Sequence, residues 1–195
     1  MRSALAIGLR TTLVTLVVTG LLYPFAVTGL AMLLFPARAQ GSWVTDEHGQ
    51  VVGSELIAQA FSAPGYFQPR PSAAGQAGYD ATSSSGSNLG PTSKKLHDGA
   101  AELLKKLESE NPGAPRAVPA ELVTASASGL DPHLSPEVAG WQIPRVARAR
   151  GVSEERIRTL VAAHTDGRTL GFLGEPRVNI LVLNLALDRQ FGRPR

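Results

Sequence analysis

The side chains best suited to chemistry lie in one loop of small residues. From Ser126 to His133 the sequence reads SASGLDPH, which places hydroxyls, a carboxylate and an imidazole close together. Serine, histidine and aspartate form the triad of many hydrolases, but the three members of a triad converge from separate structural elements. Neighbours this close in sequence rarely reach that geometry. The loop therefore does not predict catalysis, and we expect a protein without catalytic residues of its own.

An anion is a better match to this loop. Ser135-Pro136-Glu137 is typical of a helix start, because serine caps the first turn and proline suits the first helical position. Backbone N–H groups before and at a helix start can receive an anion. The candidate residues are Ser126, Ser128 and Gly129 in the loop, with Gln142 and Arg145 further along the helix. A capped turn that binds no ligand is the alternative, and the residues leave both open.

Several familiar sites are absent from the sequence. It contains no G-x-x-x-x-G-K-[ST], no G-x-G-x-x-G after a strand, no H-E-x-x-H and no G-x-S-x-G. It also lacks Asp-Lys-Thr-Gly, so the chain is not itself a phosphorylated P-type pump. There is no cysteine, which excludes disulfides and thiol chemistry, and the four histidines show no metal-ligand spacing. We predict no metal site. The net charge of +3 is scattered, so nucleic acid is not an expected partner.

These side chains are carried behind a long apolar segment. No charged residue occurs between Arg10 and Arg38, and a helix of about 20 apolar residues crosses a bilayer. We predict a short cytoplasmic segment over 1–10, a transmembrane helix over 11–37 and one soluble domain over 38–195. The alternative is a cleaved secretory signal, since Ala37-Arg38-Ala39 has the small-x-small form. The run is much longer than the apolar part of a signal peptide.

Positive charge predicts the orientation, and small residues predict packing. Arg2 and Arg10 precede the span, which favours an amino terminus inside the cell and a domain outside the cytoplasm. Gly20 and Gly29 offer a surface for close helix packing, and Pro24 is expected to kink the helix in mid-span. These three residues are candidates for a subunit interface. A lone anchor in lipid is the alternative.

A second group of interface candidates lies in the soluble domain. Tyr66 to Ser72 reads YFQPRPS, an extended aromatic and basic stretch that could dock on a partner or could be a loop packed under its own domain. The candidates here are Tyr66, Phe67, Arg70, Asn88, Asp131 and His133.

The element pattern predicts a mixed α+β domain with short strands and about four helices. Helices are expected over 54–61, 94–110, 135–150 and 153–167, with an interruption or kink near Pro144. Strands are expected over 42–44, 50–52, 118–124 and 168–174. The run 178–188 is either a buried strand or a strand leading into a helix. Residues 73–92 are expected to form a mobile loop.

The chain resembles the KdpC family, the C chains of bacterial high-affinity potassium-importing P-type ATPases. The similarity lies in TGLLYPFAVTGLA, FPARAQGS, GSELIAQAF, YFQPRPSA, SGSNLGPTS, LVTASASGLDPHLSPEVAGWQIPRVARARG and LGEPRVNILVLNLALD. The resemblance implies a single-pass subunit of the bacterial inner membrane that keeps its anchor. It also implies two partners, a channel-like potassium chain (KdpA) and an ATP-hydrolysing chain (KdpB). In that family the C chain is described as a catalytic chaperone that raises the ATP affinity of the pump chain.

The resemblance further links Gln142 with nucleotide, which implies ATP as a ligand shared with the pump chain. This implication conflicts with the predicted orientation, because a domain outside the cytoplasm cannot reach cytoplasmic ATP. One of three expectations must therefore be wrong: the predicted topology, the chaperone mechanism, or the link between Gln142 and nucleotide. Three hypotheses follow: an assembly subunit that acts on ATP affinity at a distance, a subunit that binds ATP directly in a ternary complex, and an anchored binding protein unrelated to a pump.

Overall fold

The computed structural model describes residues 2–115 and 117–194 and divides into two compact units. The first unit ends at Trp43 and the second begins at Val44. Met1, Arg116 and Arg195 lie outside the described residues, and with them the outer ends of the predicted segments 1–10 and 38–195.

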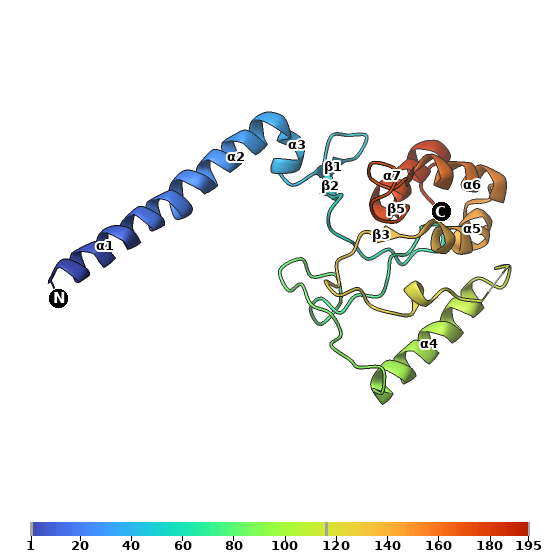
Figure 1. Cartoon of the computed structure of the whole chain (residues 1–195). Helices are drawn as coiled ribbons and strands as arrows, with labels where there is room; N and C mark the ends of the chain where they lie inside the picture. The colour runs from blue at the N-terminus through green and yellow to red at the C-terminus, as the bar shows by residue number, and fades with distance from the viewer. Residues whose placement is uncertain (1, 116, 195) are drawn as a thin grey trace. The chain divides into compact units, whose positions relative to one another are not determined.

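The first unit is a helical run that is drawn in blue in Figure 1. It consists of α1 (Arg2–Val17), the π-helical η1 (Val18–Leu22), α2 (Tyr23–Leu34) and the short α3 (Pro36–Ala39). The run from Arg2 to Leu34 has 33 residues and is long and apolar enough to cross a membrane. The bounds of this helix differ from the predicted 11–37, and the membrane span itself stays a prediction. The helix starts earlier and ends at Leu34, because Phe35 precedes Pro36 and takes non-helical angles (φ −137°, ψ 57°).

The π-helical turn explains how Pro24 fits inside this run. A proline lacks an N–H and its ring crowds the carbonyl four residues earlier, which here belongs to Gly20. The turn before Pro24 widens, and the N–H of Tyr23 donates to the carbonyl of Val18, five residues back. An added Cβ would meet nothing within 4 Å at Gly29 and only Leu16 Cδ1, at 3.6 Å, at Gly20. The interface roles of Gly20, Pro24 and Gly29 stay predictions.

The second unit combines short strands with four α-helices, which confirms the predicted α+β class. Strands β1 (Trp43–Thr45) and β2 (Val51–Ser54) form one two-stranded sheet, while β3 (His133–Leu134), β5 (Arg177–Asn179) and β4 (Thr165–Asp166) form an antiparallel sheet in that order. The helices are α4 (Lys94–Glu110), the 3₁₀ turn η2 (Ala120–Leu122), α5 (Pro136–Arg150), α6 (Glu154–Ala163) and α7 (Ile180–Phe191).

The core lies around α5. In Figure 1, α5, α6 and α7 lie together, while α4 lies beyond the irregular segments. Ile143 and Val146 of α5 are buried with Ile157 of α6 and Leu183 of α7. Among the described residues of α4, only Leu107 is buried. Helix α4 is therefore held by far less apolar contact than the other three.

One predicted helix and one predicted strand of the second unit were wrong. Residues 54–61 form no helix, because Ser54 ends β2, its Oγ accepts from Leu56 N at 3.1 Å, and Ala58 N donates to Leu130 O at 3.0 Å. These bonds tie the segment to a distant loop. The predicted strand 118–124 contains the 3₁₀ turn η2 instead, and Thr124, two residues after this turn, donates from Oγ1 to Ala120 O at 2.8 Å.

The predicted strand over 168–174 was also wrong, because these residues form a tight turn with one bridge between Thr169 and Leu173. Two further segments refine the predictions. The run 178–188 follows the second of its two alternatives, strand β5 leading into helix α7, with Asn179 as the helix cap. Helix α5 starts at the predicted Ser135 cap and continues through Pro144 to Arg150, so Pro144 does not interrupt it.

Residues 73–92 contain no helix or strand, as predicted, but side chains fasten this loop. Ser72 Oγ accepts from Tyr79 N at 2.7 Å and donates to Gly129 O at 2.6 Å. Ser85 N donates to Ser128 O at 3.0 Å. Two irregular segments, 72–86 and 126–130, therefore cross in close contact at Gly129.

Gly129→Ala should destabilise the domain at this crossing. The position has φ +67°, and an added Cβ would lie 2.5 Å from Ser85 O and 2.7 Å from Ala74 N, so the backbone would have to move. We expect the free energy of unfolding to fall by about 2 kcal/mol or more. The matched control is Gly140→Ala in helix α5, where an added Cβ meets nothing within 4 Å. This control should stabilise by about 0.5–1 kcal/mol. Urea unfolding of the full chain in detergent micelles, followed by tryptophan fluorescence, measures both. Equal midpoints for the two variants would contradict the crossing.

Candidate functional site

The segment Pro64 to Gln68 starts in a turn, in which Tyr66 N donates to Ala63 O at 3.1 Å, and is bonded to side chains of α5 and α7. Asn184 of α7 pairs with both peptide groups of Phe67, accepting from the N–H at 2.9 Å and donating to the carbonyl at 2.9 Å. Gln142 of α5 does the same for Gln68, at 2.8 and 2.9 Å. In each carboxamide the accepting carbonyl and the donating NH₂ group lie side by side, so they can pair with the N–H and the carbonyl of one residue. Two side chains thus take the place of a neighbouring strand.

Two arginines of α5 complete this clasp. Arg145 donates to the carbonyls of Pro64 (2.7 Å) and Tyr66 (3.0 Å), and also to Gln142 Oε1 (2.7 Å). Arg150 Nε donates to the carbonyl of Gly65 at 2.6 Å. Every carbonyl from Pro64 to Gln68 therefore accepts a hydrogen bond from a side chain of α5 or α7. We call this segment with Gln142, Arg145, Arg150 and Asn184 the clasp.

Asp188 of α7 lies beside the clasp and contacts both Arg150 and Tyr66. Arg150 pairs with Asp188 at 2.8 Å and its guanidinium lies 5.0 Å from the centre of the Tyr66 ring. The Tyr66 hydroxyl donates to Asp188 at 2.8 Å, and burial together with this bond raises the pKa of Tyr66. Burial lowers the pKa of Arg145 to about 10, which still leaves its guanidinium charged at neutral pH.

The five anion candidates do not meet at one place. Gln142 and Arg145 are 1% and 5% exposed, and their bonds go to the segment 64–68. Ser126 is buried near Ser128, whose exposed hydroxyl accepts from Leu130 N, and Gly129 lies at the crossing with residues 72–86. The sequence spacing placed Gln142 and Arg145 one and two turns beyond the loop, but that face of α5 packs on another part of the chain. Nucleotide binding stays a prediction.

Three of the interface candidates form a half-buried surface cluster. Arg70 pairs with Asp131 at 3.5 Å, and Asp131 lies 3.6 Å from the ring of His133 and accepts from its backbone N–H at 3.0 Å. The bond from His133 lowers the pKa of Asp131, and Arg70 contributes. Such a cluster presents both charges to a partner.

The other interface candidates have different surroundings. Asn88 is exposed at φ +51°, and Tyr66 is half-buried within the clasp. Phe67 is fully buried in the core, so its side chain cannot meet a partner. We correct that prediction: alternation along an extended segment turns Phe67 inward between its two neighbours.

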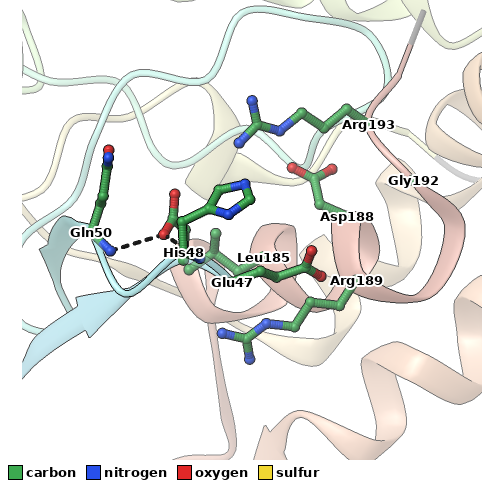
Figure 2. A pocket seen from close by; sticks show the side chains of 9 residues that line it. Glu47, His48, Gln50, Leu185, Asp188, Arg189, Gly192 and Arg193 are labelled. Atoms are coloured by element: carbon green, nitrogen blue, oxygen red, sulfur yellow. Dashed lines mark hydrogen bonds between the residues drawn. The ribbon is translucent and has the colours of Figure 1, made fainter.

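A cavity of about 420 Å³ lies between the turn after β1 and the end of α7 (Figure 2). Figure 2 shows His48 of that turn directed toward Asp188 and Arg193. Asp46 accepts from the backbone N–H groups of Gln50 and His48, and the bond from Gln50 is the main cause of its lowered pKa. Sequence reasoning missed this cavity because its charged residues come from 46–50 and 188–193, far apart in the chain.

The cavity combines carboxylates, an imidazole and guanidiniums, which suits contact with a polar or charged group. Within 2–115 and 117–194, no group of three or more histidine, aspartate or glutamate side chains could hold a metal ion.

Removing the carboxamide of Gln142 or Asn184 should destabilise the domain far more than removing that of Gln68. We expect Asn184→Ala to lower the free energy of unfolding by about 2–4 kcal/mol, because it leaves the buried N–H and carbonyl of Phe67 unpaired. Gln142→Ala should lower it by somewhat less, because the peptide groups of Gln68 are only half-buried. The control is Gln68→Ala, since only the backbone of Gln68 joins the clasp. It should change stability by about 0.5 kcal/mol or less. Urea unfolding of the full chain in micelles decides, and losses equal to the control would show that the carboxamides do not hold the segment.

Comparison with known proteins places the chain in a family. Residues 5–189 match the family model described as KdpC, the c chain of K⁺-transporting ATPase. A potassium-transporting ATPase KdpC subunit of Myxococcus xanthus is 67% identical over 192 residues, covering 98% of this chain and 90% of the relative. The KdpC subunit of Bradyrhizobium diazoefficiens is 55% identical over 188 residues, covering 91% and 92%. That of Geobacter sulfurreducens is 54% identical over 172 residues, covering 88% and 90%. This chain therefore belongs to the KdpC family, the C-chain subunits of K⁺-transporting ATPases.

Proposed function

We propose that this subunit is non-catalytic and acts as a chaperone of catalysis, raising the affinity of the ATP-hydrolysing chain for ATP. It assembles with that chain (KdpB) and with the channel-like potassium chain (KdpA) in the bacterial inner membrane. Its helix spans the membrane with the amino terminus inside, and the domain lies outside the cytoplasm. Because the chain belongs to the KdpC family, we do not keep the hypothesis of a binding protein unrelated to a pump.

One observation carries the choice of an indirect effect on ATP. The two side chains that best fitted a nucleotide, Gln142 and Arg145, are buried and bonded to the peptide groups of Pro64, Tyr66 and Gln68. To meet a ligand they would first have to release these groups. A role in holding the domain together explains both residues without a nucleotide.

Action at a distance requires unequal binding to two conformations of the pump. A subunit that binds both conformations equally shifts nothing, however tightly it binds. A difference of about 1.4 kcal/mol between the two changes the apparent affinity for ATP about tenfold. A surface contact that forms in only one conformation can supply a difference of this size.

ATP titration separates the indirect mechanism from direct binding. We expect no saturable binding of labelled ATP to the full chain alone in nanodiscs. The assembled ATPase should bind ATP about tenfold more tightly with the chain than without it. The alternative predicts saturable binding to the chain alone. In that case loss of binding in Ser128→Asp, at an exposed loop position, would assign the ligand to the loop.

Cysteine labelling tests the orientation. The sequence has no cysteine, so one introduced thiol is unique. Ala163→Cys lies at an exposed position at the end of α6, and Ser3→Cys lies at the other end of the chain, before the apolar run. A membrane-impermeant thiol reagent should label Ala163→Cys in intact spheroplasts and should label Ser3→Cys only after permeabilisation. The reverse pattern would place the domain in the cytoplasm and reopen direct contact with ATP.

A further inference from the structure

The turn between β4 and β5 presents a cluster of large apolar side chains to solvent. Leu170, Phe172 and Leu173 are 79%, 68% and 50% exposed. They occupy one turn, Arg168 to Glu175, which we call the apolar tip. Its surface is concentrated at one point, unlike the isolated exposed apolar residues that any protein surface carries.

The apolar tip is held in one conformation. Thr169 N donates to Leu173 O and Leu173 N donates to Thr169 O, both at 2.9 Å. Arg168 pairs with Glu175 at 2.8 Å at the base of the turn. A surface that is already ordered loses little conformational freedom on binding.

Leu170, at the start of the turn, is a residue type that its backbone conformation disfavours. Leu170 has φ +55° and Gly171 has φ +82°, so both central residues are in the left-handed region. Turns of this type favour Asn-Gly, because a bulky side chain is strained at positive φ. Leucine at this position weakens the turn and adds exposed apolar surface. An interaction outside this chain accounts for both.

We propose that the apolar tip docks into an apolar pocket on a partner subunit of the potassium ATPase. The inference rests on the proposed assembly and names the part of this chain that anchors it. A convex rigid knob that fills a pocket is typical of the residues that dominate protein interfaces.

Charge argues against the membrane surface as the occupant. The basic residues at the base of the tip are each paired with a carboxylate, Arg168 with Glu175 at 2.8 Å and Arg177 with Asp166 at 3.9 Å. These two basic residues are thus offset by carboxylates, so residues 166–177 carry no net charge that would add electrostatic attraction to anionic lipid.

Area argues against a second copy of this chain. Three side chains bury a few hundred Å², whereas a stable dimer needs about 800 Å² on each partner. A small anchor suffices only where another contact already holds the two chains together, because tethering raises the effective concentration. Insertion of the apolar helix beside the membrane chains of the ATPase supplies that second contact.

The test uses the full chain co-expressed with the other chains of the ATPase. A photoreactive amino acid replaces Phe172, and a matched probe replaces Leu56, another large apolar residue that is 60% exposed. We expect the probe at 172 to crosslink to a partner subunit about tenfold more than the probe at 56. Crosslinks to lipid, crosslinks to a second copy, or no excess over the control would each overturn the inference.

Leu170→Asn separates docking from folding. Asparagine suits positive φ, so this change should leave the thermal midpoint of the free chain equal or higher, while reducing co-purification with the partner chains about tenfold. Leu56→Asn is the control and should co-purify normally. A lower midpoint together with weaker assembly would make Leu170 a structural residue and overturn the inference. Normal assembly of Leu170→Asn would refute the docking alone, whereas a wild-type chain that neither co-purifies nor changes ATP affinity would refute the proposed function.

Discussion

The second unit depends on hydrogen-bond partners for a partly buried stretch of backbone that belongs to no helix or strand. From Pro64 to Gln68 the chain lies against α5 and α7, with Gly65 and Phe67 buried, Tyr66 and Gln68 half-buried and Pro64 exposed. An unpaired buried peptide group costs about 1–3 kcal/mol, so several left unpaired would consume most of the stability of a domain. The strands of this unit are too short to run alongside the segment. Side chains of the two helices take over the task, and every carbonyl of the segment has a donor.

This arrangement joins parts of the chain that are far apart in sequence. The bonds of Gln142 to Gln68 span 74 residues, and the bonds of Asn184 to Phe67 span 117. Apolar contact alone would allow the segment to slide between the helices, because it is nearly indifferent to register. Two carboxamides that each pair with one particular peptide group fix that register. Phe67 consequently enters the core while Tyr66 and Gln68 remain half-buried on either side.

Sequence reasoning succeeded where the determinants are local and failed where they are distant. The Ser135-Pro136 start of α5 and the long apolar run were predictable, because capping and apolar length are read from neighbouring residues. The expected helix at Ser54 failed because a bond from Ala58 to Leu130 determines that segment. The partners that Gln142 and Arg145 have in the structure are distant in the same way, and their predicted role toward an anion stays a prediction. A buried glutamine and arginine need partners, and the sequence does not say that these partners are backbone groups more than 70 residues earlier.

The clasp also limits how a nucleotide could be bound. For Gln142 to contact ATP, it would have to leave the N–H and the carbonyl of the half-buried Gln68 without their present partner. At about 1 kcal/mol for each group, this would weaken binding by roughly thirtyfold before any favourable contact is counted. Groups already on the surface carry no such cost. Contacts with other subunits therefore need less rearrangement at the cluster of Arg70, Asp131 and His133 and at the apolar tip. A subunit that acts on a pump through unequal binding needs only such surface contacts.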